Sequence, residues 1–133
     1  MLFRSLNDQY GELEALQNKV LTPLLQLLEK NKEAVFALDL MNEIEAPLQT
    51  NYFPRWWLDA RQWIKKMAAF SKAHTPWLPV TSAAGFATAP YEIITGNYTG
   101  LGLDFYDVHL YSDDGTFSGV IWNLDSKIGR AHV

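Results

Sequence analysis

The chain of 133 residues contains no cysteine, which excludes disulfides, zinc–thiolate sites and cysteine nucleophiles. It has no apolar run of about 18 residues, so the sequence predicts no membrane-spanning helix. The 11 Lys and Arg form no long run and the net charge is −4, which disfavours nucleic-acid binding through phosphate neutralisation. What the chain does have is 48% hydrophobic and 14% aromatic residues. This composition predicts one folded domain with a real core.

Two segments have the apolar spacing of amphipathic helices. The first is 7–32, with Asn7 or Asp8 as the expected N-cap and with Pro23 expected to bend it, because proline lacks an N–H and crowds the preceding turn. The second, 54–73, carries an apolar inner stripe and a charged outer one. Its expected inner positions are Trp56, Trp57, Ala60, Trp63, Ile64, Met67 and Phe70.

Three apolar runs predict strands, at 34–41, 78–84 and 103–111. The first is nearly continuous, which favours a strand buried on both faces. A short helix is expected around 91–95. The order helix, strand, helix, strand, short helix, strand is typical of βα units in a parallel sheet, so the predicted fold class is α/β.

Polar side chains lie where two of these strands end. Asn42 and Glu43 follow the first strand, and His109 and Tyr111 close the third, on the same face as Asp107 by the period of two. Ligands of parallel sheets bind at this edge. Each residue also has a plain structural interpretation, because an Asn-Glu pair can cap a turn and a strand histidine is often a hydrogen-bonded core residue.

Residues 37–43 are similar to the fourth strand of the clan of retaining glycoside hydrolases that includes the family 5 cellulases and mannanases, where the strand ends in Asn-Glu. Residues 103–111 resemble the sixth strand of those enzymes, whose His and Tyr line the cleft, and 79–84 stand where the fifth would be. The resemblance implies a partial TIM (β/α)₈ barrel, with about three parallel strands (the fourth to the sixth) and covering helices.

The same resemblance implies the roles of the site residues. Glu43 would be the general acid/base, Asn42 would donate to the sugar 2-hydroxyl, and His109 and Tyr111 would hold the sugar and orient the nucleophile. The substrate would be a β-linked oligo- or polysaccharide, with no cofactor and no metal. The nucleophile would be a Glu after a seventh strand, whereas the last Glu of this sequence is Glu92.

We therefore expect this chain to be part of a hydrolase and to cleave no glycoside by itself. Its open sheet edges would favour self-association. The alternative is a non-catalytic α/β module that binds a small ligand or a protein partner at the same strand ends. Neither interpretation involves nucleic acid or a membrane.

The last six residues have an unusual source. Residues 128–133 read Ile-Gly-Arg-Ala-His-Val, which is also the translation of a common sequencing-library adapter up to its stop codon. The codon of Lys127 is compatible with the adapter's first two bases. We therefore expect the incomplete hydrolase domain to occupy 1–127 and the tail 128–133 to be adapter-derived.

Overall fold

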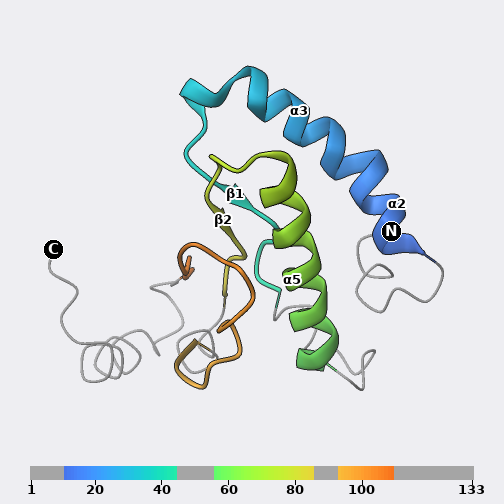
Figure 1. Cartoon of the computed structure of the whole chain (residues 1–133). Coiled ribbons are helices and arrows are strands. Elements are labelled where there is room, and N and C mark those ends of the chain that lie inside the picture. Colours follow the sequence, from blue (N-terminus) through green and yellow to red (C-terminus); the bar gives the residue numbers. More distant parts are fainter. Residues whose placement is uncertain (1–10, 45–55, 86–92, 110–133) are drawn as a thin grey trace, which may run out of the picture.

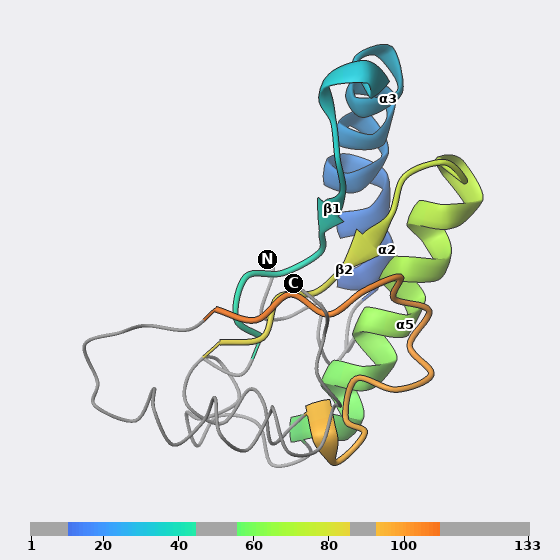
Figure 2. The same ribbon diagram turned by 90° about the vertical axis from the view of Figure 1, so that its left-hand side faces the viewer.

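The computed structural model describes residues 11–44, 56–85 and 93–109, apart from the side chains of 56–58 (Figure 1). A helix in three parts comes first: α2 (Glu12–Leu16), the π-helical turn η1 (Gln17–Leu21) and α3 (Thr22–Lys30). A 3₁₀ turn, η2 (Lys32–Ala34), leads to strand β1 (Leu38–Asp39), which is followed by helix α5 (Trp56–His74) and strand β2 (Val80–Thr81). Figure 2 views the molecule from the strand side, with both strands in front of the first helix.

The first helix confirms the predicted helical segment over its described part, whereas Asn7 and Asp8 lie outside the described residues. Pro23 stands in the first turn of α3, directly after the π turn. There the backbone N–H and the hydroxyl of Thr22 both donate to the carbonyl of Gln17. The wider turn accommodates the proline, which has no N–H and crowds the carbonyl one turn earlier, so the helix continues.

Helix α5 confirms the second predicted helix and, where side chains are described, its apolar stripe. Trp63, Ile64 and Met67 are buried, and they join apolar residues of α2, η1, α3 and β1 in one core. Further members of this core are Leu13, Leu16, Leu21, Leu25, Leu38, Leu78, Tyr98 and Leu101. No helix in the described part of the chain is long and apolar enough to cross a membrane.

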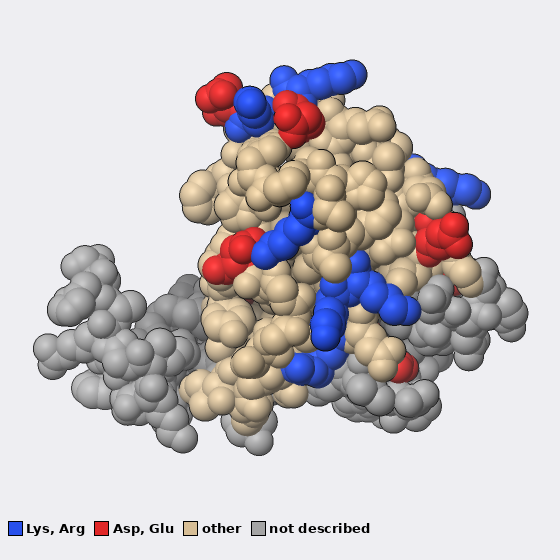
Figure 3. Space-filling model, in the orientation of Figure 1, with Lys and Arg blue, Asp and Glu red and all other residues tan. Residues whose placement is uncertain are grey.

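The cations of α5 hold the segment 93–109 against the helix. Arg61 donates to the carbonyls of Gly96, Asn97 and Thr99, and Lys72 forms an ion pair with Asp104 at 2.7 Å. Figure 3 shows Lys and Arg atoms gathered over α5. The hydrogen bond from Lys72, together with one from a backbone N–H of β2, holds the pKa of Asp104 below its ordinary value of 3.8.

The two strands pair in parallel, with Leu38 opposite Val80 and Asp39 opposite Thr81. The first predicted strand is much shorter than expected and is not buried on both faces. Phe36 is 84% exposed, and along β1 Leu38 is buried while Asp39 is exposed. One face of β1 packs on the helices, so the alternation is that of a half-buried strand.

The predicted partial TIM barrel with three parallel strands is wrong. In the described residues the sheet has two strands, and the segment expected to be the third contributes one isolated parallel bridge, Ala84 to Val108. One side chain accounts for part of the interruption. The Asp104 carboxylate accepts the N–H of Val80, so this donor is bonded to a side chain and not to the backbone of the segment 103–109. On the other edge of β2, the Asp39 carboxylate of β1 accepts the N–H of Ala83, which ends the β1–β2 ladder. In the described residues the segment 103–109 is joined to β2 and Ala84 by separate backbone bonds and not by a continuous strand ladder.

Candidate functional site

The first part of the site is the turn at 42–44 that follows β1. Met41 and Ile44 flank it and are both buried, which anchors the turn in the core. Glu43 between them has a φ of 50°, in the left-handed region that residues other than glycine rarely adopt. Such a conformation costs about 1–3 kcal/mol and persists where the surroundings enforce it, often at functional sites.

The second part is the segment 82–85 that follows β2, and it is tied to the end of β1. The Asp39 carboxylate accepts the backbone N–H groups of Met41 at 3.2 Å and of Ala83 at 2.9 Å through the same oxygen, Oδ1. The hydroxyl of Ser82 donates to the carbonyl of Met41 at 3.4 Å. These bonds therefore hold the ends of β1 and β2 side by side. Glu43 follows the end of β1, and Gly85 follows the end of β2.

The third part is the segment 107–109, which the bridge to Ala84 holds in place. The N–H of Ala84 donates to the carbonyl of Asp107, and the N–H of His109 donates to the carbonyl of Ala84, both at 2.8 Å. This pair of bonds fixes the backbone of His109 beside the end of β2. His109 and Glu43 are thus brought together although 66 positions separate them in the sequence.

The two side chains meet directly. His109 Nδ1 lies 3.1 Å from Glu43 Oε1, and only 13% of the Glu43 side chain and 28% of the His109 side chain are exposed. A carboxylate accepts and does not donate, so against an ionised Glu43 the Nδ1 atom carries the hydrogen. On the other side of the ring, Nε2 lies 3.8 Å from Asp107 Oδ2. The imidazole therefore stands between two carboxylates.

The remaining predicted site residues are placed differently. Asn42 is exposed in the turn and Tyr111 lies outside the described residues. Asp107 does share the His109 side of its segment, as the period of two predicts. Within 11–44, 56–85 and 93–109, no group of three His, Asp or Glu residues is arranged to hold a metal ion.

Gly85 belongs to the site although sequence reasoning did not single it out. A Cβ atom at position 85 would lie 2.3 Å from Cγ, 2.5 Å from Cδ and 2.8 Å from Cβ of Glu43. The Glu43 side chain therefore lies directly on the Gly85 backbone. The sequence carried one weak signal, a glycine directly after the second predicted strand.

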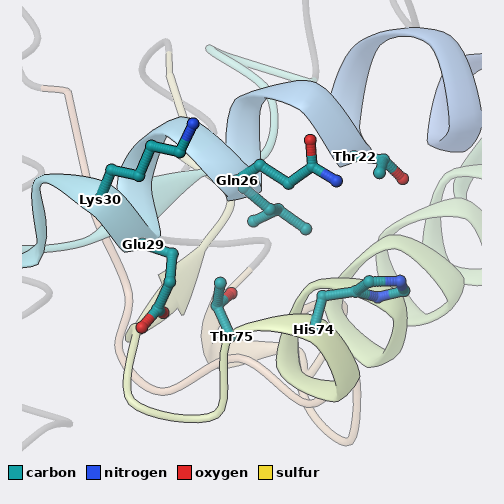
Figure 4. A pocket seen from close by; sticks show the side chains of 7 residues that line it. Thr22, Gln26, Glu29, Lys30, His74 and Thr75 are labelled. Carbon is teal, nitrogen blue, oxygen red and sulfur yellow. The ribbon is translucent and has the colours of Figure 1, made fainter.

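A cavity of about 360 Å³ lies elsewhere, between α3 and the end of α5 (Figure 4). Its polar groups are largely occupied within the fold. Glu29 accepts the indole N–H of Trp77, Thr75 donates to the carbonyl of Ser71, and His74 donates through Nδ1 to a carbonyl of its own helix. None of the predicted site residues lines this cavity.

No protein-family model matches the chain, and neither a curated protein nor a solved structure matches it significantly.

Proposed function

We propose that this chain supplies the acid/base centre of a retaining glycoside hydrolase that cleaves β-linked oligo- or polysaccharides, with Glu43 as the general acid/base. The observation that carries this proposal is the contact of Glu43 Oε1 with His109 Nδ1 at 3.1 Å. The same two residues are those for which the resemblance implies a cleft position. The left-handed backbone of Glu43 adds support, because strain of this kind concentrates at functional sites.

The reaction sets two tasks for one carboxyl group. In the first step Glu43 gives its proton to the leaving glycosidic oxygen while a second carboxylate attacks the sugar and forms a covalent intermediate. In the second step Glu43 takes a proton from the water that hydrolyses this intermediate. The nucleophile is expected to come from sequence that follows residue 127 in a longer reading frame.

His109 suits a supporting role in both steps. When Glu43 has lost its proton, the Nδ1–H of His109 donates to the carboxylate and stabilises the charge. On the opposite side of the ring, Nε2 lies 3.8 Å from Asp107 Oδ2, which is beyond hydrogen-bond distance. The contact with His109 also offsets the cost of burying the Glu43 carboxylate, whose side chain is only 13% exposed, because a buried charge without a partner is strongly unfavourable. Asn42, exposed beside Glu43, is available to the sugar 2-hydroxyl.

The test is to sequence the gene on both sides of this segment, express the complete reading frame and compare two substrates. One is a β-linked oligosaccharide, whose leaving group needs a proton, and the other is a dinitrophenyl β-glycoside, whose leaving group does not. Loss of general acid catalysis costs about 10²–10⁴-fold in rate. We expect Glu43→Gln to lose about that factor on the oligosaccharide and much less in the bond-breaking step of the dinitrophenyl glycoside.

The matched control is Glu33→Gln, which removes an exposed carboxylate from η2 and leaves both rates unchanged. Equal losses on the two substrates would contradict the acid/base role. Hydrolysis that Glu43→Gln leaves intact would also contradict the role of Glu43, whereas sugar binding without any turnover would favour the alternative of a non-catalytic binding module.

A further inference from the structure

The packing of Glu43 against Gly85 is the closest approach to a glycine in the described part of the chain. The three heavy atoms nearest to a Cβ at position 85 would all lie less than 3.0 Å away, and all three belong to Glu43. By comparison, a Cβ at Gly100 would meet nothing within 4 Å, and one at Gly102 would lie 3.8 Å from its nearest neighbour. The nearest occupant of the space at position 85 is thus the proposed acid/base.

Backbone conformation does not explain the glycine. Gly11, Gly96, Gly100 and Gly102 have positive φ angles, which favour glycine, and Gly85 does not. An alanine could adopt the backbone of Gly85, so what position 85 requires is the absence of a side chain.

The Glu43 side chain has little freedom to move away from a new methyl group. One of the three contacts, at 2.8 Å, involves its Cβ, which the backbone positions, and the left-handed φ of 50° is held between buried Met41 and Ile44. The clash therefore has to be relieved by rotating the carboxyl group away or by shifting the turn. Either movement separates Oε1 from His109 Nδ1.

We propose that Gly85 is a positioning residue, whose missing side chain seats Glu43 on the backbone and aims its carboxyl group at His109. For catalysis this inference rests on the function proposed above. The placement itself is a property of the 133-residue chain and can be measured without any substrate.

The measurement is the ¹⁵N NMR spectrum of the His109 ring in the full chain, at a pH of about 8.5, where an ordinary imidazole is neutral. We expect Nδ1 to be protonated in the original chain, because it donates to Glu43. In Gly85→Ala the Nδ1 signal should move to the range of an unprotonated ring nitrogen, as it should in Glu43→Gly. Gly100→Ala strains a positive φ but meets nothing within 4 Å, so it controls for a general loss of stability and should leave the signal unchanged.

A double substitution keeps the proposal testable if Gly85→Ala alone does not fold. Glu43→Gly removes all three contacted atoms and suits the positive φ, whereas Glu43→Ala would keep the contact at 2.8 Å. Gly85→Ala should therefore lower the urea midpoint of the original chain and leave that of the Glu43→Gly variant nearly unchanged. An equal loss in both backgrounds, or unfolding of the double variant, would overturn the proposal.

An Nδ1 signal that Gly85→Ala leaves unchanged would also overturn it. In the complete reading frame, Gly85→Ala should lower kcat on the oligosaccharide by about the factor seen for Glu43→Gln and change KM much less. These experiments distinguish failure of the hydrolase function from failure of the positioning role of Gly85. A shifted signal without glycoside turnover refutes the hydrolase and keeps the positioning role, whereas turnover that Gly85→Ala does not affect refutes the positioning role alone.

Discussion

Asp39 is the residue whose removal should most directly test how the candidate site is held together. Its Oδ1 atom accepts two backbone N–H groups, from Met41 at the end of β1 and from Ala83 at the end of β2. Both donors belong to buried residues, 7% and 0% exposed. Substitution Asp39→Ala leaves these two N–H groups without this partner, and it loosens the connection between the turn of Glu43 and the segment of Gly85.

The expected magnitude follows from those two bonds. An unsatisfied buried backbone donor costs about 1–3 kcal/mol. Asp39 itself is exposed, so water can replace part of what is lost, and the lower half of the range applies to each bond. We expect Asp39→Ala to lower the free energy of unfolding by about 2–4 kcal/mol in total, a large part of the 5–15 kcal/mol typical of a domain.

The assay is urea denaturation of the full chain followed by circular dichroism, and the matched variant is Asp39→Asn. Asparagine keeps an oxygen at the Oδ1 position and should retain most of the stability. With a slope of about 2 kcal/mol per molar urea, Asp39→Ala should lower the midpoint by about 1–2 M relative to Asp39→Asn. Equal midpoints for the two variants would refute the idea that this carboxylate oxygen joins the strand ends.

Two further predictions concern the segment beside α5. Because the folded-state pKa of Asp104 is lowered, its contribution is present above about pH 4 and is lost as the pH falls through the folded value. The urea midpoint of the original chain should fall between about pH 6 and pH 3, and in Asp104→Asn this fall should be smaller. Glu14→Gln, a substitution at an exposed site, should leave the fall unchanged. Arg61→Lys should cost about 1–2 kcal/mol of local stability, since one ammonium cannot span three carbonyls, and should speed hydrogen exchange at Gly96 and Thr99. Unchanged exchange there would contradict this role.

The helices could be predicted from the sequence because their signal is local. The spacing of Trp63, Ile64 and Met67 alone specifies the buried face of α5. This signal does not depend on which element packs against that face. The strands could not be predicted with the same reliability. An apolar run such as 34–41 has no local mark for where pairing stops, and here Ala34, Phe36 and Asp39 are exposed within a run expected to be buried.

Except for Gly85, the residues of the candidate site were visible in the sequence, but their arrangement was not. Asn42, Glu43 and His109 stand at the ends of the apolar runs, and chemistry alone marks them as candidates. Their distances depend on long-range bonds that no local pattern encodes. The bridge from Ala84 to Val108 brings His109 to Glu43, the Asp39 carboxylate ends the β1–β2 ladder, and the Asp104 carboxylate takes a donor that a ladder to the third segment would have used.

By itself, then, the sequence determined the helices, the apolar face of α5 and the chemical types at the strand ends, since each depends on neighbours within a few positions. Only the tertiary structure decided that the sheet of the described residues stops at two strands, that Glu43 adopts a left-handed backbone, and that its carboxyl group meets His109 above a glycine. The physical reason is that side-chain carboxylates and a single missing Cβ act across 24 to 66 positions of chain, where hydrophobic periodicity carries no information.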